Sequence, residues 1–145
     1  MSLLLIKDLT VHFPLPEGTV HALDGVDLAL ADHERLALIG ETGSGKTVLG
    51  HAILRLLPPG ALVRGEIRYG GHDLLTVSAA RMRQFRGREI AMVLQNPTAA
   101  LNPVLTGGRQ VQEAVTARWC FAGRLARRKV MELFARVGLP ERAVT

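Results

Sequence analysis

The chain has 145 residues, of which 48% are hydrophobic and 21% charged, and its net charge is +5. This composition predicts one globular domain and excludes a disordered or low-complexity chain. The single cysteine, Cys120, excludes an internal disulfide, and no apolar run is long enough to span a bilayer. The basic residues gather at residues 81–88 and 124–129 without interleaved aromatics, which favours solvated helix faces over a nucleic-acid interface.

The first part of the chain carries the alternating pattern of half-buried strands. Leu9, Val11 and Phe13 alternate with polar residues, and the alternation returns through residues 26–30. Between them, residues 14–18 hold two prolines and a glycine, which suits the loop of a hairpin. Residues 1–34 are therefore predicted to form an antiparallel β unit that begins with a strand and not with a signal peptide.

Two later segments, residues 36–39 and 90–94, are continuous apolar runs of the kind found in strands buried on both faces. The first run leads directly into Gly40. Residues 48–57 then repeat apolar side chains at helical spacing, and Pro58 predicts the end of that helix. The order strand, glycine-rich loop and helix is thus predicted in immediate succession.

Short elements and two longer helices fill the rest of the chain. A strand is predicted at residues 65–69 and a short basic helix at residues 79–86. Cys120 is expected to face the core, with no base to activate it. Two apolar faces predict the longer helices, the second of which stops at Gly138. Their members are Val111, Ala114, Val115 and Trp119 in one helix and Ala126, Val130, Leu133, Phe134 and Val137 in the other.

Residues 40–47, Gly-Glu-Thr-Gly-Ser-Gly-Lys-Thr, match the phosphate-binding pattern G-x-x-x-x-G-K-[ST]. Glycines let the backbone curl so that N–H groups point at phosphate oxygens, and the positive end of the following helix adds to the attraction. Lys46 is expected to reach the β- and γ-phosphates, and Thr47 to place its hydroxyl on Mg²⁺. The predicted nucleotide-binding residues of this segment are Gly40, Glu41, Thr42, Gly43, Ser44, Gly45, Lys46, Thr47 and Val48, and Lys46 is also expected to be catalytic.

The alternative to a phosphate-binding loop is an ordinary glycine-rich turn before a helix. It is disfavoured because a buried strand is predicted to enter the loop and a long amphipathic helix to leave it. The loop pattern itself is shared by kinases, GTPases, helicases and transport ATPases. The surrounding sequence must decide among them.

Two stretches, Val-Asp-Leu-Ala-Leu at residues 26–30 and Glu-Arg-Leu-Ala-Leu-Ile followed by the loop at residues 34–47, closely resemble the start of an ABC-transporter ATP-binding domain. Residues 65–67 and 71–74, Gly-Glu-Ile and Gly-His-Asp-Leu, are similar to the small β subdomain of that family. Residues 90–97, Ile-Ala-Met-Val-Leu-Gln-Asn-Pro, are similar to its Q-loop. Residues 98–103, Thr-Ala-Ala-Leu-Asn-Pro, are similar to the subgroup of importers for dipeptides, oligopeptides and nickel.

The resemblance implies an α/β fold of the P-loop NTPase type. Residues 1–34 are expected to form the antiparallel β subdomain, and residues 35–97 the P-loop core up to the Q-loop. Residues 98–145 are expected to form the start of a helical subdomain. All of residues 1–145 would then be the N-terminal part of one ABC ATP-binding domain.

The resemblance also gives roles to two residues outside the loop. Gln95 stands where the Q-loop glutamine of the family contacts Mg²⁺ or the attacking water, so it is expected to be catalytic and metal-binding. The structural alternative for Gln95 is a surface turn. Phe13 stands where the family places an aromatic ring that stacks on adenine, with core packing as the alternative. His12 would then point to the opposite side.

Several parts of the family pattern are altered or do not occur in this sequence. His33 replaces the usual glycine before Glu34, and Thr42 replaces a serine, without loss of a ligand contact. No Leu-Ser-Gly-Gly signature, Walker-B Asp-Glu strand end or switch histidine follows. The chain alone is therefore expected to be inactive in hydrolysis. We also expect a truncated product or fragment whose core is incomplete, with the strands at 36–39 and 90–94 exposed.

The expected function is binding of ATP and Mg²⁺, coupled in the complete protein to hydrolysis and to import of peptides or nickel. The expected partners are a second ATP-binding subunit and permease subunits that face the segment after Pro103. The protein would be peripheral at the cytoplasmic face of the membrane, with membrane contact only through the permease and with no nucleic acid. The alternatives are a binding module without hydrolysis, a P-loop kinase or GTPase, and a soluble ABC ATPase. The scattered histidines predict no metal site.

Overall fold

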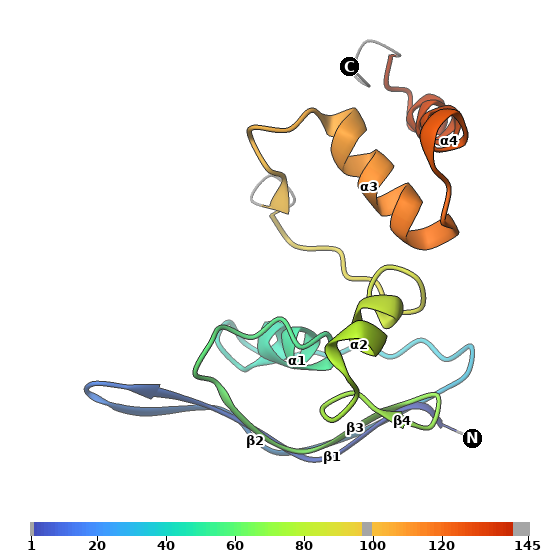
Figure 1. The fold of residues 1–145 in the computed structure, drawn as a ribbon. Helices are drawn as coiled ribbons and strands as arrows, with labels where there is room; N and C mark the ends of the chain where they lie inside the picture. The colour runs from blue at the N-terminus through green and yellow to red at the C-terminus, as the bar shows by residue number, and fades with distance from the viewer. Residues whose placement is uncertain (1, 97–99, 141–145) are drawn as a thin grey trace. The chain divides into compact units, whose positions relative to one another are not determined.

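The computed structural model describes residues 2–96 and 100–140 (Figure 1). The chain divides into two compact units, residues 1–83 and residues 84–145, and each is described by itself. Within the described ranges, no helix combines the length and the apolar character needed to cross a membrane.

The first unit is built on a four-stranded antiparallel sheet with the strand order β2-β1-β3-β4. Its two long strands form the predicted hairpin, closed by a turn at residues 16–17. The predicted strand at residues 65–69 is also confirmed, as part of β3. The four strands are β1 (Ser2–Leu15), β2 (Gly18–Ala31), β3 (Leu62–Tyr69) and β4 (His72–Asp73).

A bulge in β1 keeps its apolar residues on the core side of the sheet. Leu4, Ile6, Leu9 and Val11 are all buried, although the step from Ile6 to Leu9 is three residues and not two. The register shifts there in both ladders, and Asp8 has a positive φ of 45°. An extra residue at a bulge restores the inward direction that strict alternation would lose.

Helix α1 (Lys46–Ile53) lies over the sheet in Figure 1 and buries Leu49 and Ala52. It ends earlier than the apolar spacing predicts, because Arg55 takes a left-handed φ of 50°. The Arg55 guanidinium then donates to the carbonyl of Val77 at 2.8 Å. Residues 54–55 therefore form a turn after the helix and residues 56–57 have no regular structure, so the predicted helix to residue 57 is wrong at its end.

The two predicted core strands at residues 36–39 and 90–94 are not strands in the structure. Ile39 is 92% exposed and Val93 is 94% exposed. A parallel strand needs a partner backbone beside it, and the described part of the chain supplies one only as an isolated bridge between Arg86 and Ile90. The apolar pattern was recognised correctly, but the pairing that would turn it into strands is not supplied by these residues.

The second unit contains the two predicted long helices, α3 (Gly107–Trp119) and α4 (Gly123–Arg136). The shorter α2 (Ala79–Phe85) precedes them, as predicted. Leu139 N donates to Phe134 O at 2.9 Å while Gly138 takes a φ of 74°, which confirms the predicted stop. The helices share a core made of Val115, Ala126, Val130 and Phe134, with Val111, Phe121 and Leu133 packed against it.

The end of α3 departs from the sequence prediction. Cys120 is exposed and does not face the core. It forms the C-cap of α3 with a φ of 56°, so the chain turns there and the thiol leaves the apolar face of the helix. The Arg88 guanidinium donates to its sulfur at 2.7 Å. Trp119 is also 44% exposed, at the edge of the core and not within it.

Candidate functional site

The glycine-rich loop at residues 40–47 is a compact turn that leads into α1. Ser44 N donates to Glu41 O at 3.2 Å, which folds the start of the loop back on itself. Gly43 and Gly45 have φ values of 87° and 88°, in the left-handed region that residues with a Cβ atom avoid. The loop thus uses its glycines where the curl requires them.

Gly45 also fixes the loop against the sheet. A Cβ atom at this position would lie 2.6 Å from Ala22 O and 2.7 Å from a methyl carbon of Leu23, both in β2. By contrast, a Cβ atom at Gly43 would meet nothing within 4 Å. The two glycines have nearly the same φ, but of the two only Gly45 is needed for close packing.

Lys46 closes the loop from the inside. Its ammonium donates to Gly40 O at 2.8 Å, to Glu41 O at 2.6 Å and to Ser44 Oγ at 2.9 Å. These three acceptors match the three N–H donors of an ammonium group. The charge of Lys46 therefore lies at the centre of the turn, where an anion cradled by the loop would meet it.

The first turn of α1 presents unused backbone donors to the same place. The helix has Gly45 as its N-cap without a side-chain cap, and its first hydrogen bond runs from Leu49 N to Gly45 O at 2.9 Å. The N–H groups of Lys46, Thr47 and Val48 consequently have no acceptor inside the helix. Such groups, together with the helix dipole, form an anion site.

Thr47 and the loop side chains before it have room for further ligands. Glu41, Thr42 and Thr47 are exposed, and the Thr47 hydroxyl has no partner in the part of the chain that the structure describes. A hydroxyl in the first helical turn, beside an anion site, is a suitable oxygen ligand for Mg²⁺. The glycine curl, the ammonium and the free amides together fit a polyphosphate with a hard cation.

An apolar cavity of about 170 Å³ lies beside the loop. The sequence analysis did not predict this cavity. Part of the cavity is lined by Leu38 and Ile39, which do not belong to a strand. The continuous apolar run before Gly40 was the available signal. The other lining residues are Leu23, Val26, Gly40, Ser44, Gly45, Lys46 and Leu49.

The structure does not bring all predicted site residues into one described unit. The loop belongs to the first unit, whereas Gln95 belongs to the second. Gln95 is exposed in a bend after residues 91–94, which have no regular structure. Pro97 to Ala99, part of the expected Q-loop stretch, lie outside the described residues.

Phe13 lies near the tip of the β1–β2 hairpin. It is half-buried and pairs with Val20 of β2. The neighbouring pair is His12 and His21, whose ring centroids are 4.0 Å apart. A half-buried ring at a hairpin tip is partly free to contact a ligand, so its place is compatible with both interpretations of Phe13 given above.

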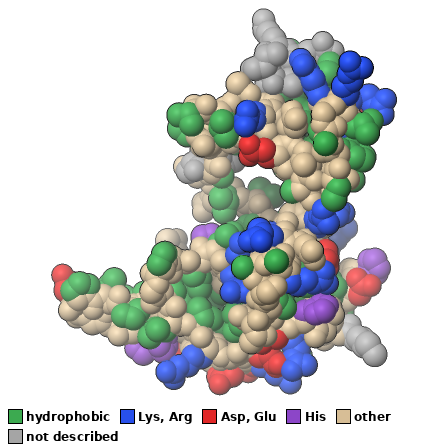
Figure 2. All heavy atoms as spheres, in the orientation of Figure 1, with side chains coloured by type: hydrophobic (Ala, Val, Ile, Leu, Met, Phe, Trp, Pro, Cys, Tyr) green, Lys and Arg blue, Asp and Glu red, His purple; other side chains and the backbone are tan. Residues whose placement is uncertain are grey.

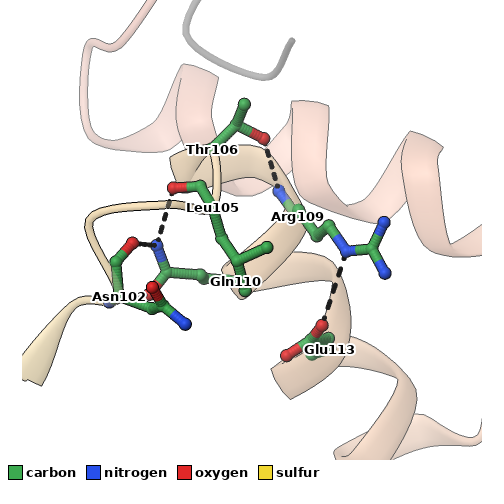
Figure 3. Close-up of polar contacts among 6 residues, drawn as sticks. All are labelled: Asn102, Leu105, Thr106, Arg109, Gln110 and Glu113. Carbon is green, nitrogen blue, oxygen red and sulfur yellow. Dashed lines mark hydrogen bonds and ion pairs between the residues drawn. The ribbon is translucent and has the colours of Figure 1, made fainter.

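The start of α3 carries a polar network that the sequence analysis did not identify (Figure 3). The Gln110 amide donates to Asn102 O at 3.0 Å and to Leu105 O at 3.1 Å, and its oxygen accepts from Asn102 N at 2.8 Å. Thr106 caps the helix by accepting from Arg109 N at 3.3 Å. A threonine before a helix is a readable capping signal, whereas the bonds of Gln110 across eight residues are not.

A polar hollow of about 700 Å³ adjoins this network. Arg109 and Glu113 lie on its wall as an ion pair, with Arg109 Nε 3.6 Å from Glu113 Oε1. The hollow is lined mainly by one face of α3. Its lining residues are Thr106, Arg109, Gln112, Glu113, Thr116, Ala117 and Arg127.

Comparison with known proteins gives a consistent result. A family model described as ABC transporter matches residues 23–145. A putative peptide import ATP-binding protein of Brucella abortus (strain 2308) is 44% identical over 142 residues, which cover 97% of this chain and 43% of that protein. The oligopeptide transport ATP-binding protein OppD of Bacillus subtilis (strain 168) is 40% identical over 95% of this chain and 39% of its own length. The chain thus spans about two fifths of these curated relatives.

Solved structures agree with this result at the level of the fold. The ATP-binding cassette MJ0796, in a dimeric post-hydrolysis state bound to ADP and Pi, has a TM-score of 0.79 and 23% sequence identity. The match covers 97% of this chain and 60% of that one. At this identity the likeness shows the fold, which is a partial ABC ATPase fold as the sequence predicts.

Proposed function

Because the chain belongs to the ABC transporter family, we propose that it is the ATP-binding part of a peptide importer subunit. One observation supports this most directly: the loop at residues 40–47 encloses the Lys46 ammonium beside the free N–H groups of α1. This arrangement is suited to the β- and γ-phosphates of a nucleotide. The names of the relatives, which refer to peptide and oligopeptide transport, favour peptides over the alternative, nickel.

In this proposal the loop residues hold the phosphates. Residues 40–48 supply backbone N–H groups, and Lys46 supplies the positive charge. Thr47 and Gln95 would provide oxygen ligands for Mg²⁺, which neutralises phosphate charge when bound. Phe13 would stack on the adenine ring. We retain residues 1–34, 35–97 and 98–145 as the proposed β, P-loop and helical parts of the domain.

The proposed partners are a second ATP-binding subunit and a membrane permease. A related cassette is dimeric, which supports the first. The polar hollow on α3 is the surface we assign to a cytoplasmic loop of the permease, since it follows Pro103 and combines charged and hydrogen-bonding side chains. Its use would place the protein at the cytoplasmic face of the membrane.

We propose that these 145 residues bind nucleotide but do not hydrolyse it. The sequence contains neither an Asp-Glu strand end nor a Leu-Ser-Gly-Gly signature to complete the charge stabilisation of phosphoryl transfer. The complete protein would supply those parts and hydrolyse ATP during transport.

Isothermal titration of the folded chain with ATP and Mg²⁺ tests the proposal, with phosphate release measured in parallel. We expect saturable binding and no phosphate release above the rate in buffer. Absence of binding by a chain with the circular dichroism of a folded protein would refute the proposed site. Equal binding of ATP by a Lys46→Met variant would show that the nucleotide binds elsewhere.

A further inference from the structure

The outward face of α4 is a cationic surface that the proposed function does not use. Helix α4 turns Ala126, Val130 and Phe134 into the core, and the opposite face carries Arg124 and Arg128. In Figure 2, Lys and Arg side chains gather at the upper right, over the end of the chain that holds α4, with hydrophobic side chains beside them. From residue 114 to residue 140 the cations are Arg118, Arg124, Arg127, Arg128, Lys129 and Arg136, against the single carboxylate of Glu132.

The one carboxylate on this face is already neutralised. Lys129 Nζ lies 2.8 Å from one oxygen of Glu132 and 2.9 Å from the other. This hydrogen bond is the main cause of a lowered pKa at Glu132. The charge of Arg128 also helps to lower this pKa, but neither Arg124 nor Arg128 forms an ion pair with a carboxylate in the part of the chain that the structure describes. Their positive charge is therefore available to an outside partner.

Apolar side chains lie among these cations. Trp119 is 44% exposed and Leu125 is 53% exposed. The ring centroids of Trp119 and Phe121 are 6.4 Å apart, and the rings are stacked. Lys129 Nζ lies 5.7 Å from the centroid of the Trp119 ring. A hollow of about 180 Å³ is lined by Phe121 and Leu125 together with Arg128, Lys129 and Glu132. The aromatic ring, the leucine and the cations thus share one continuous surface.

We propose that this surface, formed by Trp119, Phe121, Leu125 and the cations of α4, binds the anionic headgroups of a phospholipid bilayer. Cations attract anionic lipids, while tryptophan and leucine enter the boundary between headgroups and acyl chains. A single-stranded nucleic acid would stack its bases on the aromatic rings, and a duplex would contact the cations through its phosphates, but neither would use the exposed Leu125. This lipid contact adds to the attachment through a permease and does not depend on nucleotide binding.

Trp119 is the only tryptophan in the chain, so its fluorescence reports directly on this surface. Vesicles of phosphatidylcholine with phosphatidylglycerol should shift its emission to shorter wavelength, and brominated lipid should quench it. Pure phosphatidylcholine vesicles should leave the emission unchanged. An equal shift with neutral vesicles would overturn the proposal, because binding would then not need the cations and could come from the exposed apolar residues at 36–39 and 93–94. An RNA polymer that shifts the emission when vesicles do not would also overturn it.

Charge-neutralising variants locate the surface. The double variant Arg124→Gln/Arg128→Gln should weaken partitioning to the anionic vesicles about thirtyfold, which is the typical contribution of two cations to binding at an anionic membrane surface. The matched control Lys7→Gln/Arg64→Gln removes the same charge from the exposed side chains of β1 and β3 and should weaken it far less. Leu125→Ser should reduce quenching by brominated lipid while the chain remains bound. Equal losses in the double variant and its control would refute the α4 surface.

Discussion

The loop at residues 40–47 follows an apolar run, and the segment at residues 90–96 contains one. The two differ in the contacts that maintain their conformations. The loop is held by contacts among its own residues and with β2, through Lys46 and Gly45. In the other segment only Ile90 bridges a neighbour, and residues 91–96 form no hydrogen bond to any other described residue. A local motif can fix its own geometry, whereas a core strand depends on the backbones beside it.

The largest expected effect concerns the charge inside the loop. Lys46→Met keeps a side chain of similar length but removes the ammonium group. The variant therefore cannot form charge-assisted hydrogen bonds to phosphate. We expect nucleotide affinity to fall by about a hundredfold or more. Titration calorimetry with ATP and Mg²⁺ measures the affinity, with Lys7→Met, at an exposed side chain of β1, as the control. A similar loss in both variants would contradict the role of Lys46.

The next prediction separates the two left-handed glycines of the loop. Gly45→Ala should destabilise the chain by about 3 kcal/mol, since it adds a clash with Ala22 O to the cost of a positive φ. Gly43→Ala has the same φ but open space, and should cost about 1 kcal/mol. Urea unfolding followed by circular dichroism measures both. Equal costs would show that β2 does not fix the loop.

A smaller effect is expected where the second unit has its own local network. Gln110→Ala removes three hydrogen bonds to Asn102 and Leu105, and should destabilise the start of α3 by about 2 kcal/mol. Faster hydrogen exchange at Asn102 N would report it. Gln112→Ala, two residues further along the same helix, is the matched control and should leave that exchange rate unchanged.

The smallest effect on stability is expected at Gln95, which lies in the segment at residues 90–96. Gln95→Ala should leave urea unfolding within about 0.5 kcal/mol of the parent, because the side chain is exposed. If Gln95 serves Mg²⁺, the variant should still reduce the gain in ATP affinity that Mg²⁺ provides, by about tenfold. A titration with and without Mg²⁺ distinguishes this outcome from a surface turn without function.

Sequence reasoning succeeded where the information is local. The alternation of Leu9 and Val11 gave the β1–β2 hairpin, and the glycines around Lys46 gave the loop, because both depend on neighbouring residues. It failed at residues 36–39 and 90–94, where the apolar pattern is that of a buried strand but no neighbouring strand is available to pair with it. The exposure of Cys120 was also missed, since the left-handed C-cap of α3 redirects the chain at that residue.

The proposed surface on α4 could not be predicted from local sequence patterns either, because it also depends on the packing of neighbouring elements. The helical spacing of Ala126, Val130 and Phe134 predicted which face of α4 is buried. It did not show that Trp119 and Leu125 remain exposed beside the arginines, because exposure depends on how the two helices pack. The sequence therefore suggested only solvated basic faces.

The three hydrogen bonds of Lys46 also hold the residues of the loop to one another. In the proposed function, a phosphate oxygen that approaches the ammonium would replace one of these carbonyl or hydroxyl acceptors, which lie 2.6 to 2.9 Å from Nζ. A neutral acceptor would then be exchanged for an anionic phosphate oxygen, which makes the stronger charge-assisted hydrogen bond, so Lys46 would still favour binding by the difference. In the proposed function, part of the interaction energy of the ammonium would therefore maintain the shape of the loop, and only the remainder would contribute to nucleotide affinity.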